Sequence, residues 1–188
     1  MRTRESGFTL IEAIVVAAVG MITIGLAAPS LTGAIEHYRF NTDVQQLATT
    51  IRNARYKAVS LNQPVRVRLN CPSQGLMRVV QVTGNSAIDD AADRCDEAAY
   101  PYPGTTTATA GDGPVIAMGT AIDYPSDASS IEVSTTGRMV PLAGCPACAA
   151  GSPPFSLVVE DHRNSIQRSV TVSASGSVTV ANFATAGQ

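Results

Sequence analysis

The stretch FTLIEAIVVAAVGMITIGLAAPSLTGAI, from Phe8 to Ile35, decides the fold of this chain. Between Ala13 and Ala28 it carries no charged residue. A run of roughly 20 apolar residues crosses a bilayer as a helix. We therefore expect residues 8–35 to form a transmembrane helix that anchors the chain.

The seven residues before this run form a polar leader that carries Arg2 and Arg4. Basic residues stay on the cytoplasmic side of a membrane span, so the part after the helix is expected to be exported. A secretory signal peptide is the alternative, with a cleavage site among small residues after the apolar run. Glu12 favours the anchor, because a carboxylate inside an apolar helix costs a few kcal/mol and a signal peptide has no use for it.

A second helical pattern follows and predicts an amphipathic continuation over residues 36–62. Apolar residues recur at alternating spacings of three and four positions, which places them on one face of a helix. They are Val44, Leu47, Ile51, Ala54 and Ala58. Basic residues off this face are expected to meet solvent or neighbours, namely Arg52, Arg55 and Lys57. The sequence Asn62-Gln63-Pro64 ends the helix.

The hydrophobic period then changes to that of strands. Apolar residues alternate with arginines over 65–69, which is typical of a half-buried strand, and Leu76 to Val82 is the returning strand. Further strand candidates are 115–122, 130–134, 155–160, 166–173 and 177–181. We expect residues 63–188 to form a β-rich globular domain. The predicted fold class is α+β, a long N-terminal helix packed on an antiparallel β-domain.

Residues 83–113 interrupt the strand pattern. They are rich in Ala, Asp, Thr, Pro and Gly, and they hold a cluster of acidic side chains. A connection of this length is predicted to be a surface insertion that contains a short helical turn.

Composition and motifs exclude several classes of function. Lys and Arg number 13 against 15 Asp and Glu, for a formal net charge of −2, so the chain is not a polycation built for nucleic acid. The sequence contains no phosphate-binding glycine loop, G-x-S-x-G or H-E-x-x-H motif. The only histidines, His37 and His162, lie beside no evident nucleophile or metal partner. We predict no enzymatic activity, no cofactor and no metal.

Four cysteines follow the apolar run, namely Cys71, Cys95, Cys145 and Cys148. An even number beyond a membrane anchor favours disulfides in an oxidising compartment. The simplest of the three pairings is Cys71–Cys95 with Cys145–Cys148, and pairing across the two regions stays open. Zinc is less favoured because the set holds a single C-x-x-C pair. No βαβ pattern surrounds that pair, as a thioredoxin-like site would require.

The sequence GFTLIE, Gly7 to Glu12, resembles the class III signal of type IV pilins and type II secretion pseudopilins. The resemblance implies that a prepilin peptidase cuts between Gly7 and Phe8 and that the new amino group of Phe8 is methylated. Glu12 is then the fifth residue of the mature chain, the position of the family's acidic residue. Pro29 is the twenty-second, where many members have a helix-kinking proline.

The physics of Glu12 agrees with assembly into a fibre. A carboxylate buried in a fibre core needs a cation or hydrogen-bond donors. The amine created at Phe8 of a neighbouring subunit would supply the cation, set the register and draw a subunit out of the bilayer. The alternative is that Glu12 reaches the cytoplasmic interface of the membrane by itself.

The end of the long helix narrows the resemblance. Ala54-Arg55-Tyr56-Lys57-Ala58 is similar to the Ala-Arg-x-x-Ala pattern that ends this helix in the GspH/FimT family of minor pseudopilins and minor pilins. Gly137-Arg138 and Gly176-Ser177 resemble that family's paired strand-and-glycine segments. The resemblance implies a structural subunit that helps to initiate or cap a type II secretion pseudopilus or a type IV pilus.

The same resemblance implies a location and a set of partners. The subunit would sit in the inner membrane as a single-pass protein, with its leader in the cytoplasm and its globular domain in the periplasm, before it enters the fibre. Its partners would be other pilins or pseudopilins through the N-terminal helix, the prepilin peptidase, the inner-membrane assembly platform and membrane lipid.

Two other functions stay open. Some FimT-like members bind DNA through basic residues near the C-terminus, and a DNA-binding minor pilin of a competence pilus is the first alternative. Here the last glycine turn, Gly176 to Thr179, contains no Arg. The candidate DNA contacts are Arg66, Arg68, Arg78 and Arg138, but we favour a solvated strand face for the first three. The second alternative is a bitopic membrane protein that never enters a fibre.

Overall fold

The computed structural model describes residues 9–104, 109–119, 122–123, 130–140, 154–161 and 166–182, and for residues 26–31 and a few strand residues it describes the backbone alone. By its contacts the chain divides into two units, Met1–Arg39 and Phe40–Gln188. This division falls inside the long helix, whereas the sequence places the start of the globular domain at residue 63. The second half of the helix therefore belongs to the globular unit.

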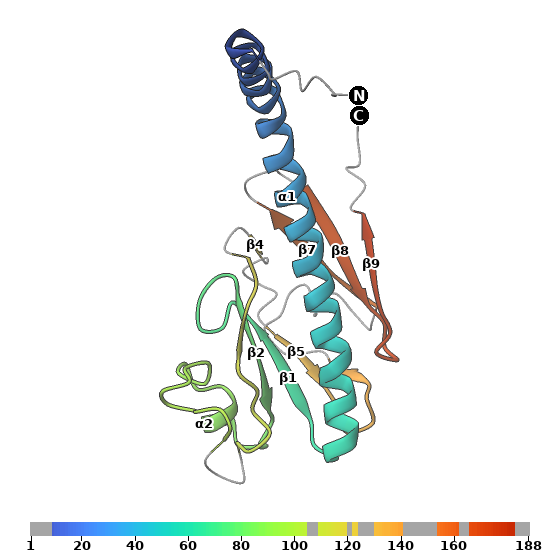
Figure 1. The fold of residues 1–188 in the computed structure, drawn as a ribbon. Helices are drawn as coiled ribbons and strands as arrows, with labels where there is room; N and C mark the ends of the chain where they lie inside the picture. Colours follow the sequence, from blue (N-terminus) through green and yellow to red (C-terminus); the bar gives the residue numbers. More distant parts are fainter. Residues whose placement is uncertain are drawn as a thin grey trace, which may run out of the picture. The chain divides into compact units, whose positions relative to one another are not determined.

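The long helix, α1, runs from Leu10 to Leu61 (Figure 1). It ends where Asn62 takes a φ of 52°, in the left-handed region. Pro64 follows and has no N–H to continue the helix. The predicted end at Asn62-Gln63-Pro64 is confirmed.

In the first unit, α1 exposes large apolar side chains on all of its sides. Nine of these side chains are between 53% and 79% exposed. Because each residue of an α-helix is rotated by about 100° from the one before it, the nine side chains are spread around the whole helix. They are Leu10, Ile11, Ile14, Val15, Val16, Val19, Met21, Ile22 and Ile24. Where the structure describes side chains, it holds no helical stretch that is both long and apolar enough to span a membrane.

In the second unit, the predicted apolar stripe of α1 forms the centre of the core. Its five members are at most 1% exposed, which confirms the helical spacing seen in the sequence. They are Val44, Leu47, Ile51, Ala54 and Ala58. The same core contains the inward side chains of both sheets, such as Val67 and Val170.

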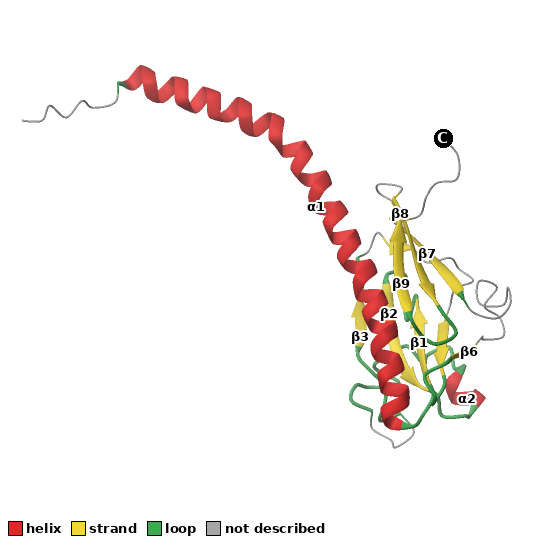
Figure 2. Cartoon of the chain, turned by 90° about the vertical axis from the view of Figure 1, so that its right-hand side faces the viewer, coloured by secondary structure: helices red, strands yellow, loops and turns green. Residues whose placement is uncertain are grey.

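The strands form two antiparallel sheets (Figures 1 and 2). The five-stranded sheet has the order β3 (Val115–Ala117), β2 (Leu76–Gln81), β1 (Val65–Leu69), β5 (Ser130–Val133) and β6 (Met139–Val140). The four-stranded sheet has the order β4 (Ile122–Asp123), β7 (Phe155–Asp161), β8 (Ile166–Val172) and β9 (Val178–Asn182). The predicted α+β fold class is confirmed.

Two features of the sheets differ from the sequence prediction. The candidate strand at 115–122 is two short strands in different sheets, β3 and β4. The strand β6 was not predicted, because its two residues are too few to show an alternating pattern.

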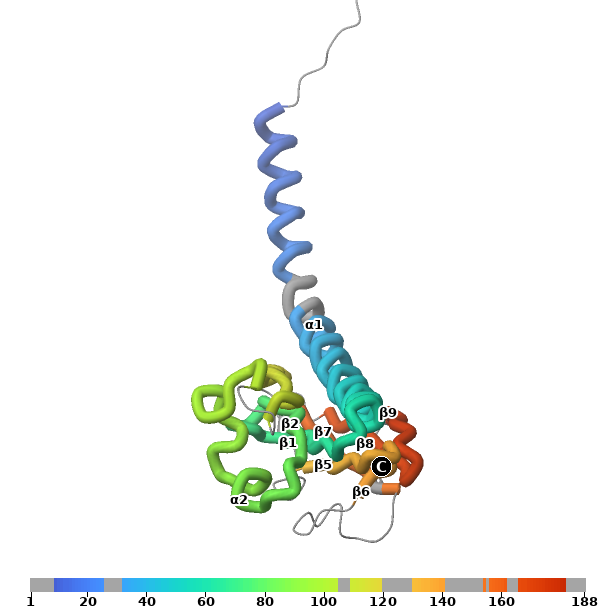
Figure 3. Tube along the Cα trace, turned by 90° about the horizontal axis from the view of Figure 1, so that it is seen from below, coloured from blue at the N-terminus to red at the C-terminus, as the bar shows by residue number. Residues whose placement is uncertain are grey.

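The described residues of the insertion, 83–104 and 109–113, cover the face of the five-stranded sheet opposite α1. Figures 2 and 3 show α1 and the short helix α2 (Ser86–Asp89) on opposite sides of β1. The predicted helical turn is confirmed. The prediction that 65–69 is half-buried is wrong, because four of its five residues are buried and the fifth is half-buried. We refer to the described residues of this stretch, 83–104 and 109–113, as the covering segment.

Candidate assembly and binding sites

The predicted assembly residues lie in or before the first unit. Gly7 and Phe8 fall outside the described residues, and only the helical backbone of Pro29 is described. Glu12 lies in the first turn of α1, where its N–H faces Thr9 Oγ1 at 3.4 Å and its side chain is exposed. An acidic residue in a first turn interacts favourably with the helix dipole. Within the described part of the chain no ion pair includes Glu12.

The candidate DNA-contact arginines of β1 and β2 do lie together, as the predicted hairpin requires. Arg68 pairs across the two strands with Arg78, and Arg66 pairs with Val80. The prediction of a solvated strand face is nevertheless wrong, because Arg66 is 9% exposed and Arg78 is fully buried. The covering segment excludes water from this face.

Arg66 is neutralised by two carboxylates. Its guanidinium donates to Glu132 Oε2 of β5 at 3.0 Å and to Asp90 Oδ1 of the covering segment at 2.9 Å. Burial acts to lower the pKa of Arg66, but the hydrogen bonds and charges of Asp90 and Glu132 outweigh it and raise that pKa above its usual value. Arg66 therefore joins β1 to its neighbour strand and to the covering segment at once.

Arg78 has main-chain partners instead of acidic ones. Its guanidinium donates to the carbonyls of Gly113, Arg94, Asp96 and Tyr100, at distances from 2.5 to 3.4 Å. These four carbonyls all belong to the covering segment. A guanidinium bonded in this way holds a loop in one conformation, and its full burial keeps it away from a phosphate.

A second buried arginine comes from the covering segment itself. Arg94 forms an ion pair with Asp112, also donates to Gln81 O of β2 at 3.1 Å, and lies over the Tyr100 ring at 4.5 Å. Asp112 in turn accepts from the N–H of Gln81 at 2.8 Å. Neither Arg94 nor Asp112 was predicted from the sequence. The signal available was a single arginine inside an otherwise acidic stretch.

The remaining DNA candidate, Arg138, does not join this group. It is exposed and follows Gly137 in the turn between β5 and β6. A Cβ at Gly137 would lie 3.0 Å from Arg55 Nε, so this turn packs against α1. The structure therefore does not bring the four candidate arginines onto one accessible face.

The basic residues that were expected off the apolar stripe have specific positions. Arg52 is exposed, and its Nη2 donates to Val178 O of β9 at 2.7 Å. Arg55 is half-buried against two glycine turns. Lys57 is half-buried, and burial lowers the pKa of its amine in spite of the opposing charge of Asp112.

The cysteine prediction is confirmed for one pair. Cys71 and Cys95 form a disulfide, with their Cα atoms 5.2 Å apart, that ties the covering segment to the end of β1. Cys145 and Cys148 lie outside the described residues, as does His162. Among the described residues no group of three or more His, Cys, Asp or Glu is placed to hold a metal ion.

Comparison with known proteins gives two family matches and one similar structure. The model of the family described as type II transport protein GspH matches residues 43–176, and the prokaryotic N-terminal methylation motif matches residues 2–28. A search of the curated proteins found no match. Among solved structures, the type IV minor pilin FimU of Pseudomonas aeruginosa is similar at 12% identity and a TM-score of 0.46, with 81% of this chain and 93% of that chain covered.

Proposed function

The chain belongs to the GspH family of type II transport proteins, and from this membership we propose that it is a minor pseudopilin or minor pilin that helps to initiate or cap its fibre. The role is structural, with no catalytic step. The fibre is a type II secretion pseudopilus or a type IV pilus.

The observation that carries the proposal is the exposed apolar surface around the whole first part of α1. A helix that is apolar on every side is stable only when lipid or other protein surrounds it. Soluble monomers rarely leave such a surface uncovered. Lipid would cover it before assembly, and the N-terminal helices of neighbouring subunits would cover it in the fibre.

Glu12 would fix how neighbouring subunits align along the fibre when their apolar helices pack together. In a fibre core its carboxylate would need a cation, because an unpaired buried charge is strongly destabilising. Cleavage between Gly7 and Phe8 would create that cation as the amine of Phe8, which is then methylated. The match to the N-terminal methylation motif over residues 2–28 supports this processing. A bend at Pro29 would let the two parts of α1 fit separate surroundings in the fibre.

The partners follow from the same proposal. The leader faces the cytoplasm, where the prepilin peptidase removes it, and the globular unit faces the periplasm. The assembly platform of the inner membrane receives the processed subunit, and other pilins or pseudopilins contact it through α1.

Replacement of Glu12 tests the proposal. We expect Glu12→Ala to be cleaved after Gly7 as efficiently as the wild type, as mass spectrometry of the N-terminus reports, and to be absent from sheared fibres. Glu36→Ala removes an acid from the same helix beyond the apolar part and serves as the matched control that is still incorporated. Normal incorporation of Glu12→Ala would refute the register role.

A second variant separates the proposal from a bitopic membrane protein. Replacement of Gly7 by Val blocks the cleavage that the motif predicts, so the leader is retained. We expect this variant to stay in the membrane fraction and to abolish the contribution of the protein to fibre assembly. Full function of the uncleaved protein would favour a membrane protein that does not enter a fibre.

A further inference from the structure

One arginine beneath the covering segment lacks the acidic or main-chain network that its neighbours have. Arg68 donates to Ala91 O at 3.4 Å, which is its one hydrogen bond among the described residues. The three described ion pairs involve Arg66 and Arg94 instead. Burial lowers the pKa of Arg68 below its usual value, and the nearby charges of Arg66 and Arg94 act in the same direction, whereas the charge of Asp90 opposes them. Its surroundings thus leave a positive charge without a counter-charge in contact.

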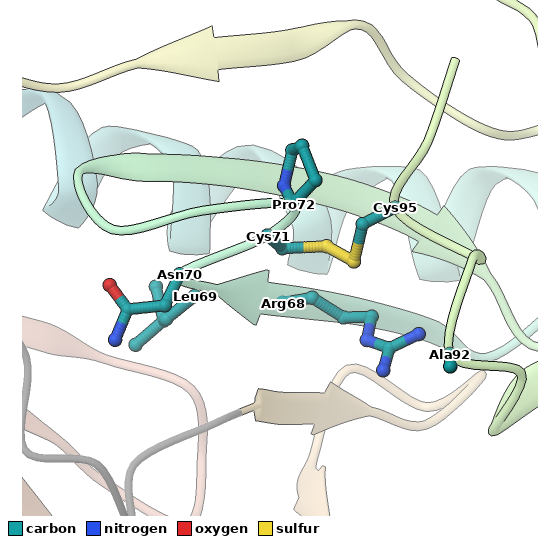
Figure 4. A pocket seen from close by; sticks show the side chains of 7 residues that line it. All are labelled: Arg68, Leu69, Asn70, Cys71, Pro72, Ala92 and Cys95. Atoms are coloured by element: carbon teal, nitrogen blue, oxygen red, sulfur yellow. A yellow bond between two sulfur atoms is a disulfide. The ribbon is translucent and has the colours of Figure 1, made fainter. Parts of the chain in front are cut away.

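This arginine lines a cavity of about 230 Å³ beside the disulfide. Figure 4 shows the side chain of Arg68 extending along β1 toward Ala92, on the side where Cys71 and Cys95 are joined. The lining comprises Arg68, Leu69, Asn70, Cys71, Pro72, Ala92 and Cys95. The disulfide fixes both walls, since it links the end of β1 to the covering segment.

The size of the cavity limits what it can hold. Pockets for drug-sized ligands span roughly 300–1,000 Å³, so this cavity accommodates a small group rather than a whole cofactor. The polar side chains of its walls are the guanidinium of Arg68 and the amide of Asn70, whose buried Oδ1 has no hydrogen-bond partner among the described residues; the other wall atoms are apolar or main-chain. A guanidinium presents a planar fork of donors that matches a carboxylate with two parallel hydrogen bonds.

The acidic residues near Arg68 distinguish a carboxylate from a phosphate. Asp90 is 66% exposed beside Arg66, and Asp93, next to Ala92, is exposed as well. A doubly charged phosphate would meet these two negative charges with a single free guanidinium to balance them. Phosphate sites need several clustered cations. A singly charged carboxylate needs only one.

We propose that this cavity, called here the Arg68 pocket, binds one carboxylate group of a partner polypeptide. The carboxylate forms hydrogen bonds with the Arg68 guanidinium and supplies an ion-pair partner, which no described residue provides. Two sources offer this group, the side chain of a partner's Asp or Glu and the free C-terminus of a partner chain. The inference does not depend on the fibre role of the protein.

Titration of small carboxylates into the full-length protein, with its disulfide intact and in detergent micelles, tests the proposal. The measured signals are the NMR shifts of the backbone amides of Ala92 and Cys95. We expect acetate to shift both in a saturable way in the millimolar range. Phosphate at equal ionic strength is expected to bind at least about tenfold more weakly, and the uncharged N-acetylalanine amide not to bind.

Two singly charged probes distinguish the sources of the carboxylate. N-acetylalanine presents a chain end, and N-acetylglutamic acid α-amide presents only a side-chain carboxylate. Tighter binding of the first supports a partner C-terminus, and tighter binding of the second supports an acidic side chain. Binding of neither, or phosphate binding as tight as acetate, overturns the proposal.

Variants assign the effect to Arg68. Arg68→Met keeps the length of the side chain without its charge, and we expect acetate affinity to fall at least about tenfold, as loss of a charge-assisted hydrogen bond implies. The control Arg138→Met alters an exposed arginine of another turn and is expected to leave affinity unchanged. Should Arg68→Met not fold, Arg68→Lys decides, because loss of the planar fork still weakens binding. Unchanged acetate affinity in the folded variant overturns the proposal.

Discussion

Arg94 and Asp112 form an ion pair from which water is wholly excluded. Arg94 Nη2 lies 2.9 Å from Asp112 Oδ1, and both side chains are 0% exposed. The pair closes the covering segment on itself, and both partners also bond to the main chain of Gln81 in β2. It therefore connects the segment to the five-stranded sheet at a point that the sequence pattern alone does not reveal.

Removal of one partner should be far more damaging than removal of both. Asp112→Ala leaves the Arg94 guanidinium buried without its carboxylate, and we expect the free energy of unfolding to fall by about 3–5 kcal/mol. Urea denaturation of the full-length protein in a non-denaturing detergent measures this. Asp93→Ala, in the same segment but exposed, is the matched control and should change stability by less than about 0.5 kcal/mol.

The double variant Arg94→Met/Asp112→Leu removes both charges and keeps apolar volume. Replacing a buried ion pair by packed apolar residues is often neutral or stabilising, so this variant should recover most of the loss. A double variant as unstable as Asp112→Ala would mean that the hydrogen bonds to Gln81, rather than the unpaired charge, dominate.

Two glycine turns meet at one arginine of α1. A Cβ at Gly176 would lie 2.7 Å from Arg55 Cδ and 2.9 Å from Gly137 O, and Gly176 has a φ of 80°. Gly84 has the same φ of 80°, but nothing lies within 4 Å of its Cβ position. These two glycines therefore share the same positive φ and differ in their surroundings.

The comparison of Gly176→Ala with Gly84→Ala separates those two effects. We expect Gly84→Ala to cost about 1–2 kcal/mol, the penalty of a left-handed conformation for an L-residue. Gly176→Ala should cost more, because its methyl group also displaces Arg55 or the Gly137 carbonyl. Thermal or urea unfolding of both variants measures the difference. Equal losses would show that Arg55 moves aside without cost.

The contact of Arg55 with the two glycine turns explains why the family patterns are visible in the sequence alone. Arg55 belongs to the Ala-Arg-x-x-Ala pattern, and Gly137 and Gly176 belong to the paired glycine segments. The fold brings all three together at the end of α1. The apolar stripe is equally readable, because each of its residues faces one core and follows the helical period.

The arginine face could not be predicted in the same way. Alternation over 65–69 shows which side chains share a face, but not what covers the second face. The cover is the covering segment, and the arginines beneath it bond to long-range carboxylate and carbonyl groups such as those of Glu132 and Gly113. Hydrophobic periodicity carries no information about such contacts. A strand face whose arginines are buried in a hydrogen-bond network therefore has the same sequence pattern as a strand face exposed to solvent.

Loss of the disulfide should loosen the covering segment specifically. Cys71 and Cys95 are separated by 24 positions, and closing a loop of about this length contributes on the order of 3 kcal/mol. We expect Cys71→Ser/Cys95→Ser to lower the free energy of unfolding by that amount and to speed proteolytic cleavage within 83–113. Limited proteolysis followed by mass spectrometry locates the cuts.

The second cysteine pair offers a comparison for this effect. If Cys145 and Cys148 are bonded, as the sequence predicts, their loop is much shorter and Cys145→Ser/Cys148→Ser should cost less. Its cleavage pattern within 83–113 should match the wild type. If residues 83–113 resist proteolysis in the Cys71→Ser/Cys95→Ser variant as well as they do in the wild type, the contacts of Arg78 and Arg94 alone hold the segment.

The burial of Arg66 and Arg78 argues most directly against the alternative function, DNA binding. Arg66 bonds to Glu132 and Asp90, and Arg78 donates to four main-chain carbonyls. Both side chains are buried, so neither guanidinium is accessible to a phosphate. We therefore expect a gel-shift titration of double-stranded DNA to show no tight, salt-sensitive complex. Arg138→Ala should leave the result unchanged, since one exposed arginine neutralises at most one phosphate.

Neutralising the two acidic partners of Arg66 should have the opposite effect and strengthen DNA binding. Asp90→Asn/Glu132→Gln removes the two carboxylate charges that balance Arg66, and any residual attraction to DNA should strengthen in this variant at low salt. Affinity for DNA falls steeply with salt in proportion to the phosphates neutralised, so the slope counts the arginines that have become available. Tight binding by the wild type with a slope that reports several phosphates would contradict the inward placement of these side chains and favour the DNA-uptake function.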